Sequence, residues 1–411
     1  MSEYEKLQMT ANKDEGGFVK NLKGQTGTGF AAGTHVHKDW YAKTQSYDEG
    51  MEALQKDVDE REDLLIPLSH IQPTINENDR FVFEIEDRHY TPTDWALGQF
   101  STKSAIPSST VLRELNRDIV DPFQPLLVNL KRDRQDAETM VAVAENALRR
   151  LDQNKKYRVR TYADGTMRAF LSERYACVDN RWYLDVLKSY LPGGRLSHWR
   201  GDADTIYGNI LLPDTIIDYG QDDDSDYGGM LSIGNCEIGK RRVSQCPSLF
   251  RSICMNGCIW GQISGKKISK KHLGKINLDE LSIMIRDNID KQLPLIPLGV
   301  ERLIAVRSYG CDDVPMKNLV AAVCSSLRFS KSESTEVLTQ WVQNERQDRN
   351  LFGIVNSITR AGQTFGNDGW VRFDELGGSL LEMNDSRWNA FKQRADSFEE
   401  KELEKLFVTA I

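Results

Sequence analysis

The spacing of apolar residues changes along the chain from strand-like to helix-like. In the middle of the chain apolar and polar residues alternate, a pattern typical of strands that bury one face. This alternation predicts strands at residues 81–86, 195–200, 205–212, 229–235, 241–246 and 257–263. Between residues 155 and 171 two alternating runs flank Asp164-Gly165, a pair that favours a two-residue turn, so we expect a hairpin there.

Beyond residue 277 the apolar residues recur every three or four positions, the period of an amphipathic helix. This period predicts helices at residues 279–293, 315–327, 331–346, 350–365, 372–381 and 386–407. Earlier helices are expected at residues 47–65, 94–100, from 108 onward, 122–151 and 180–190. Thr93 is the expected N-cap of the helix at 94–100.

These elements predict the α+β class, with a strand-rich central region packed with helices and an all-helical C-terminal region. We expect three parts: an N-terminal extension (1–62) that is partly flexible, an α+β core (63–276) and a helical region (277–411). The Gly-rich run Gly24–Gly33 has the glycine spacing of a phosphate-binding loop, but Phe30 replaces the required lysine. A flexible arm is therefore favoured over a nucleotide site.

Composition narrows the class of protein. The 411 residues are 39% hydrophobic and 28% charged, which suits a globular chain with a sizeable core. The net charge of -8 means that any site for a polyanion must be a local patch. The polar N-terminus and the lack of a long apolar run predict no secretory signal and no membrane span. With seven cysteines, an odd number, we expect reduced thiols and a cytoplasmic location.

Positive charge is concentrated in two segments. Six basic residues and two acids lie between residues 155 and 174, and nine basic residues and one acid lie between 237 and 275. Tyr157, Tyr162, Phe250 and Trp260 are interleaved and could stack on bases. The expected contacts to nucleic-acid phosphates are Arg158, Arg160, Arg168, Lys240, Arg241, Arg242, Arg251, Lys266, Lys267, Lys270 and Lys271.

The alternative for these segments is a solvated charged face. The run from 214 to 226 carries six aspartates and no lysine or arginine, and it could balance the positive charge. The same run could fold over the basic segments as an internal mimic of nucleic acid.

The sequence supports a metal site or a catalytic site less than it supports a nucleic-acid site. Cys236, Cys246, Cys254 and Cys258 include only one short spacing, unlike the two knuckles of a zinc ribbon, even if His272 is added. We therefore expect buried thiols and no metal or cofactor. Asp202 and Asp204 would share one face of a strand and could hold magnesium, although a polar turn is favoured. No catalytic residue is assigned.

Three segments together resemble a known family. They read RAFLSERYACVDN (168–180), NCEIGKRRVSQCPSLFRSICMNGCIWG (235–261) and NLFGIVNSITRAGQTF (350–365), and VRFDELGGSLLE follows. In this order they are similar to signature segments of the phage/plasmid-like proteins, a family of unknown function found in bacteriophages, prophages and plasmids. The resemblance spans roughly residues 65–385, and Cys236 stands where serine is usual.

The resemblance implies a phage- or plasmid-encoded protein, located in the host cytoplasm if it is encoded by a phage. The company that such genes keep suggests DNA metabolism, and a distant relation to phage single-strand annealing proteins is a further conjecture. The resulting hypothesis is a non-enzymatic protein that binds single-stranded DNA through a basic groove as a homo-oligomer, with annealing as an extension of that activity. The alternatives are a protein-interaction or structural phage protein, such as a host-defence inhibitor or a virion component, and a magnesium-dependent nuclease or nucleotidyl transferase.

Overall fold

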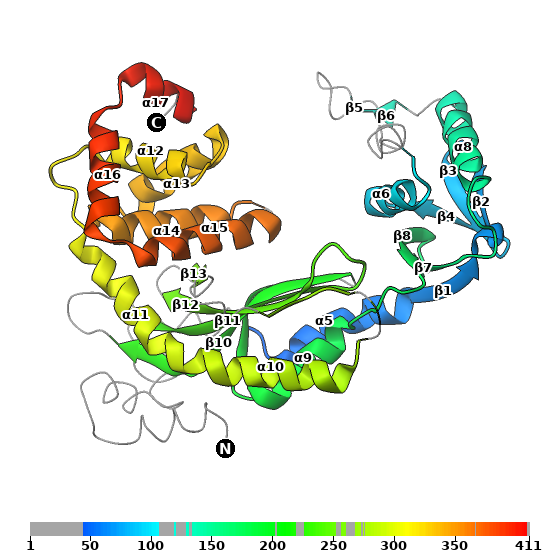
Figure 1. Cartoon of the computed structure of the whole chain (residues 1–411), viewed down its shortest axis with the longest axis horizontal. Helices are drawn as coiled ribbons and strands as arrows, with labels where there is room; N and C mark the ends of the chain where they lie inside the picture. Colours follow the sequence, from blue (N-terminus) through cyan, green and yellow to red (C-terminus); the bar gives the residue numbers. More distant parts are fainter. Residues whose placement is uncertain are drawn as a thin grey trace.

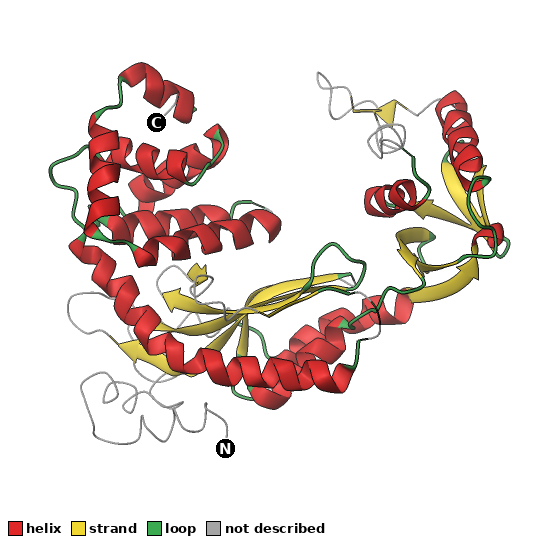
Figure 2. Ribbon diagram, in the orientation of Figure 1, coloured by secondary structure: helices red, strands yellow, loops and turns green. Residues whose placement is uncertain are grey.

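The computed structural model contains two six-stranded sheets, a short two-stranded pair, helices that pack on the sheets and a C-terminal group of helices (Figure 1). Strands dominate the central region and helices the C-terminal region, so the α+β class is confirmed (Figure 2). The structure describes residues 44–106, 119–120, 129–130, 134–201, 204–218, 226–251, 256–259, 268–272, 274, 276–365 and 367–408.

The N-terminal sheet has the strand order β1-β7-β8-β4-β3-β2. Its strands are β1 (Arg61–Pro67), β2 (Ile71–Ile75), β3 (Phe81–Ile85), β4 (Arg88–Pro92), β7 (Lys156–Tyr162) and β8 (Thr166–Ser172). All neighbours are antiparallel except β4 and β8, which are parallel. Helices α6 (Asp94–Lys103) and α8 (Arg134–Leu148) pack on it. Its core is a chain of aromatic rings in contact: Phe81, Phe83, Phe100, Phe170 and Tyr157.

The central sheet is antiparallel, with the order β13-β12-β11-β10-β9 and with β14 also paired to β12. Its strands are β9 (Arg195–Gly201), β10 (Thr205–Asp218), β11 (Asp226–Cys236), β12 (Val243–Arg251), β13 (Asn256–Ile259) and β14 (Ile268–Lys270). Helices α5 (Tyr47–Glu60), α9 (Asn180–Tyr190), α10 (Leu278–Gln292) and α11 (Ile296–Ala305) lie along one face (Figure 1). Apolar side chains of these helices and of the sheet form the main core.

Helices α14 (Leu351–Gly362) and α15 (Asn367–Ser379) lie on the opposite side of the central sheet (Figure 1). Every residue of α14 except Arg360 is buried, as expected of a helix at the centre of a bundle. The remaining helices are α12 (Met316–Ser326), α13 (Lys331–Asn344), α16 (Asp385–Asp396) and α17 (Glu400–Leu406). Short elements are η1 (Leu68–His70), η3 (Leu293–Leu295), η4 (Val306–Ser308), η5 (Leu380–Glu382), β5 (Ile119–Val120) and β6 (Asn129–Leu130).

Most predicted elements are confirmed. The hairpin is β7–β8, with Gly165 at φ 78° in its turn. Thr93 caps α6 by accepting a hydrogen bond from Ala96 N. Helix α9 has the predicted bounds, and each predicted central strand is present. The alternation and turn signals succeeded here because neighbouring strands are also neighbours in sequence.

Four predicted helices have wrong bounds. The helix expected at 372–381 begins five residues earlier, at Asn367, and ends at Ser379. The helix expected at 47–65 ends at Glu60, and the chain continues as the strand β1. The helix expected at 122–151 begins only at Arg134, since Asn129–Leu130 pairs with Ile119–Val120. The helix expected at 386–407 is divided into α16 and α17.

Other elements were not predicted at all. Helix α11 was missed because Pro294 and Pro297 suggest a break, yet Pro297 occupies the first turn, where its missing N–H costs nothing. Strands β2 and β4 each contain a proline, and β1 and β14 were also missed. The Gly-rich run at 24–33 and the helix expected from 108 lie outside the described residues. Of the expected N-terminal extension, Tyr47 and Leu54 are buried in the main core.

A glycine lets α11 pack closely on the central sheet. A Cβ at Gly229 in β11 would lie 2.4 Å from Cδ1 and 2.6 Å from Cγ2 of Ile296. We expect Gly229→Ala to lower the free energy of unfolding by about 1–3 kcal/mol through overpacking. Gly310→Ala is the control, because a Cβ there meets nothing within 4 Å. Urea denaturation measures both variants, and equal midpoints would show that this contact does not limit the packing.

Candidate nucleic-acid interface

Two of the predicted phosphate contacts are buried in ion pairs. The Arg160 side chain on β7 is 2% exposed, and it donates to Asp63 Oδ1 and Oδ2 at 2.8 Å and to Glu237 Oε2 at 2.6 Å. Arg251 at the end of β12 is also buried and donates to Glu345 Oε2 at 3.0 Å. The expectation that these two arginines contact phosphate therefore fails, because neither guanidinium reaches the surface.

Two further predicted residues are partly exposed and close to acids. Arg158 Nη1 lies 3.8 Å from Asp63 Oδ2. The guanidinium of Arg168 lies 3.7 Å from the ring centre of Tyr162, and its Nη1 is 3.7 Å from Asp204 Oδ2. The Arg158 contact lies within the N-terminal sheet, and the Arg168 contact reaches the start of β10 in the central sheet, so both arginines are less available to a ligand.

The other described residues that were predicted to contact phosphates lie in the turn between β11 and β12 and at the end of the adjacent strand β14. Lys240, Arg242, Lys270 and Lys271 are exposed, and Arg241 is half-buried. Strand pairing places Lys270 opposite Val243, next to Arg242. Lys266 and Lys267 lie outside the described residues.

A third segment brings another basic residue to this place. Ala176 N donates to His272 O at 3.4 Å, and Gly274 N donates to Arg174 O at 3.2 Å. Arg174 is exposed, and its place beside Lys271 could not be predicted from the sequence. We call the five exposed cations the basic patch: Arg174, Lys240, Arg242, Lys270 and Lys271.

Two half-buried aromatic rings border the basic patch. Trp95 on α6 donates from Nε1 to Ile238 O at 3.0 Å, and Lys240 Nζ lies 5.8 Å from its ring centre. Tyr175 stacks on His272 with ring centres 5.4 Å apart. Neither ring was predicted to bind bases, because each lies in a different segment from the patch lysines. Rings beside cations are the usual platform for unpaired bases.

The aromatic residues predicted for stacking lie elsewhere. Tyr157 is part of the aromatic core of the N-terminal sheet, and Tyr162 is buried between the two sheets. The Trp260 residue and the Phe250 side chain are outside the described part of the chain. Burial, rather than base stacking, explains the apolar face of β7.

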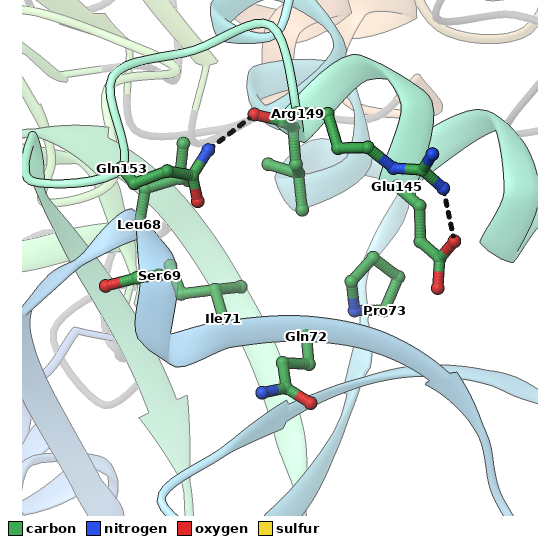
Figure 3. A pocket seen from close by; sticks show the side chains of 9 residues that line it. Leu68, Ser69, Ile71, Gln72, Pro73, Glu145, Arg149 and Gln153 are labelled. Carbon is green, nitrogen blue, oxygen red and sulfur yellow. Dashed lines mark hydrogen bonds and ion pairs between the residues drawn. The ribbon is translucent and has the colours of Figure 1, made fainter.

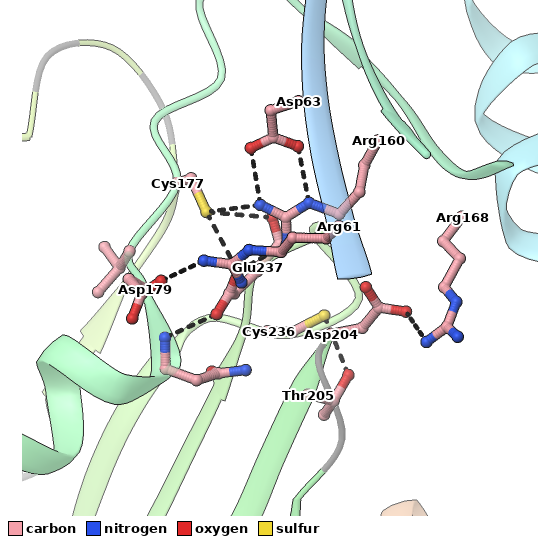
Figure 4. Close-up of polar contacts among 12 residues, drawn as sticks. Arg61, Asp63, Arg160, Arg168, Cys177, Asp179, Asp204, Thr205, Cys236 and Glu237 are labelled. Carbon is pink, nitrogen blue, oxygen red and sulfur yellow. Dashed lines mark hydrogen bonds and ion pairs between the residues drawn. The ribbon is translucent and has the colours of Figure 1, made fainter. Parts of the chain in front are cut away.

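The turn that carries Lys240 and Arg242 of the basic patch is anchored by a buried carboxylate (Figure 4). Glu237 is 1% exposed, and its Oε2 accepts from both Arg61 Nη1 and Arg160 Nη1. Its Oε1 accepts from Asn180 N, at the start of α9, at 2.7 Å. Arg61 also pairs with Asp179, the N-cap of α9. We call these residues the Glu237 network, together with Asp63.

The network lowers the pKa of two of its acids, Asp63 and Asp179, whereas burial raises the pKa of Glu237 in spite of the opposing charges of Arg160 and Arg61. Burial disfavours ionisation of Asp63, but the hydrogen bonds and charge of Arg160 more than offset it and lower the pKa of that carboxyl. The pKa of Asp179 is also lowered, since the backbone N–H of Trp182 and the Arg61 side chain outweigh its burial. Burial raises the pKa of the Cys177 thiol to about 12, so it is protonated and a poor nucleophile at neutral pH.

No metal site is evident in the part of the chain that the structure describes. No three His, Cys, Asp or Glu side chains there are grouped to hold an ion. Cys236 and Cys246 are buried thiols, and Cys254 and the Cys258 side chain lie outside the described residues. Asp204 is buried and accepts from Tyr162 Oη at 3.3 Å, while Asp202 is not described. Among the described helices, none is long and apolar enough to cross a bilayer.

A separate pocket lies between β2 and the end of α8 (Figure 3). Its volume is about 370 Å³, and Leu68, Ile71 and Leu148 contribute its apolar lining. Arg149 is the cation that lines this pocket, and it is already paired with an acid, since its Nη2 lies 3.1 Å from Glu145 Oε2. The pocket therefore attracts an anion only weakly, and the basic patch is the stronger candidate for a nucleic-acid site.

Comparison with models of protein families, with curated proteins and with solved structures finds no match for this chain. Its function is therefore inferred from its own residues.

Loss of the Glu237 charge should destabilise the protein strongly. Glu237→Gln removes the buried charge that Arg61 and Arg160 share and leaves them only Asp179 and Asp63, so we expect a loss of about 3 kcal/mol or more in the free energy of unfolding. Glu62→Gln is the matched control, because Glu62 pairs with Arg88 at 3.1 Å in an exposed position. That change should cost less than about 1 kcal/mol. Similar losses in both variants would mean that the network does not anchor the turn.

Proposed function

We propose that this protein binds single-stranded DNA along the basic patch, as a non-enzymatic protein of phage or plasmid DNA metabolism. One observation carries the proposal: three separate segments bring five exposed cations together at one end of the central sheet. In a chain with a net charge of -8, such a concentration is what a local polyanion site requires.

A single strand suits the patch better than a duplex. Trp95 and Tyr175 border it with half-buried rings, and unpaired bases can stack on such rings whereas paired bases cannot. Neither ring lies on a helix shaped and charged to enter a major groove, since α6 packs on the N-terminal sheet. Binding through phosphates and stacking would tolerate any sequence.

The resemblance to phage/plasmid-like proteins supports the part of the proposal that assigns the protein to phage or plasmid DNA metabolism. Two of the three signature segments, 168–180 and 235–261, contribute residues to the basic patch. Annealing of two strands by a homo-oligomer would extend the same activity, because each copy of the chain presents one patch. The protein-interaction alternative predicts a protein partner and no nucleic acid on the same surface.

The proposal predicts salt-dependent binding of an oligonucleotide. The logarithm of the affinity for an unstructured single strand should fall linearly with the logarithm of salt concentration, by about 0.7 for each phosphate contacted. Lys270→Glu combined with Lys271→Glu should weaken binding about tenfold and reduce the slope by about 1. Lys401→Glu, an exposed lysine on α17, is the control and should change neither quantity.

Fluorescence anisotropy over a salt series measures both quantities. Absence of binding at low salt, or an affinity that does not depend on salt, would contradict the proposal. Purification with a bound protein and without nucleic acid would instead support the protein-interaction alternative.

A further inference from the structure

The buried face of the central sheet toward α15 carries a group of polar side chains beside the apolar Leu211 and Met230. Strand pairing aligns Ser197, Asn209, Ser232 and Cys246 across β9 to β12, and all four are buried. Tyr207, two residues before Asn209, shares this face, and its ring lies 5.7 Å from that of Trp370 on α15. A buried sheet face is ordinarily apolar, as the opposite face of this sheet is. This group of polar side chains therefore needs an explanation.

Several polar atoms in this layer lack hydrogen-bond partners. Within the described part of the chain, Tyr207 Oη, Asn209 Nδ2 and Ser248 Oγ are buried without one, and the carboxyl of Asp374 is buried beside the Trp370 indole, its donor. Asp374 lies on α15 and is 0% exposed. Each group without a partner costs about 1–3 kcal/mol relative to a hydrogen-bonded one. We call this layer between α15 and the central sheet the polar seam.

Burial of Asp374 favours its neutral form. Burial raises its pKa well above the usual value, the Trp370 indole opposes this effect, and the charge of Glu375 adds to it. Tyr207 is its neighbour on the sheet, since burial and then the Asp374 charge raise the pKa of Tyr207. Cys246, Arg241 and Glu375 are the other titratable groups that act on Tyr207. A neutral carboxyl offers one donor and one acceptor.

The polar seam is continuous with the basic patch. The guanidinium of Arg241 lies 5.5 Å from the Tyr207 ring centre, and Arg241 stands between Lys240 and Arg242 in the chain. A strand whose phosphates lie on the patch therefore has its bases next to the edge of the seam. Hydrogen-bonding groups and two aromatic rings, Tyr207 and Trp370, line that edge.

We propose that the polar seam is a nucleobase-binding site and that α15 is its displaceable cover. Every base has an edge with a donor beside an acceptor, which the Asp374 carboxyl can match. Asn209 and Ser248 supply further partners, and Tyr207 supplies a stacking surface. Because the closed seam buries groups without partners, opening α15 costs less than opening a fully paired interface. This inference rests on the proposed function and assigns it a second set of contacts.

The test compares two strands of equal length, one with bases and one abasic, on the full-length protein. The wild type should bind the base-bearing strand at least tenfold more tightly, because only that strand fills the seam. Asp374→Leu should reduce this preference to less than threefold and leave affinity for the abasic strand unchanged. Asp374→Asn should retain the preference, since a carboxamide also has one donor group beside an acceptor. Asp385→Asn, an exposed change on α16, is the control.

A melting experiment checks the seam without any ligand. Because the folded-state pKa of Asp374 is raised, its burial costs stability as pH rises above the unfolded value of about 4. Asp374→Asn should therefore raise the melting temperature at about pH 8 and have no such effect near pH 4. If Asp374→Asn lowers the melting temperature equally at pH 8 and at pH 4, the carboxyl of Asp374 is fully hydrogen-bonded in the closed seam. That result would overturn the seam proposal.

Hydrogen exchange locates the bound base. The base-bearing strand should change the exchange of α15 amides, and the abasic strand should not. Equal affinity for the two strands, with both lost when Lys270 and Lys271 are reversed, would overturn the seam proposal and retain the proposed function. Absence of binding to either strand would overturn both.

Discussion

The buried carboxylate of Glu237 determines how the two sheets of this protein are joined. It follows β11 of the central sheet, and its partners Arg61 and Arg160 belong to β1 and β7 of the N-terminal sheet. Its other oxygen caps the start of α9 through Asn180 N. Burying these charges is favourable only when all partners are in place, because each alone would be desolvated without compensation. The two sheets can therefore meet in few other arrangements.

The same turn separates charges of opposite sign. Glu237 points inward, while Lys240 and Arg242, a few residues later, are exposed. The Ile238 carbonyl between them accepts hydrogen bonds from Trp95 and Gln99 of α6, which fixes the turn against the N-terminal sheet. A rigid turn displays the patch lysine at a constant position, which lowers the entropic cost of binding a flexible strand. The proposed interface thus depends on the network that anchors it.

Local signals explain what could be predicted from the sequence. Asp164-Gly165 and alternating residues on each side sufficed for the β7–β8 hairpin, because both strands lie within a few residues of the turn. The role of Arg160 could not be predicted, since its partners lie 97 and 77 residues away in sequence and have no motif. The exposed lysines of the patch could be predicted as one group because they lie close together in sequence. Only the fold brings Arg174 and the Trp95 ring next to them.

A double-mutant cycle between Arg160 and Glu237 tests the central claim most directly. Arg160→Met, Glu237→Gln and the combined variant are compared with the wild type by urea denaturation, and the coupling free energy is calculated. If the network joins the two sheets, the double variant should be more stable than the sum of the single changes implies, by at least about 1.5 kcal/mol. A coupling below about 0.3 kcal/mol would mean that the two residues act independently and would contradict the account.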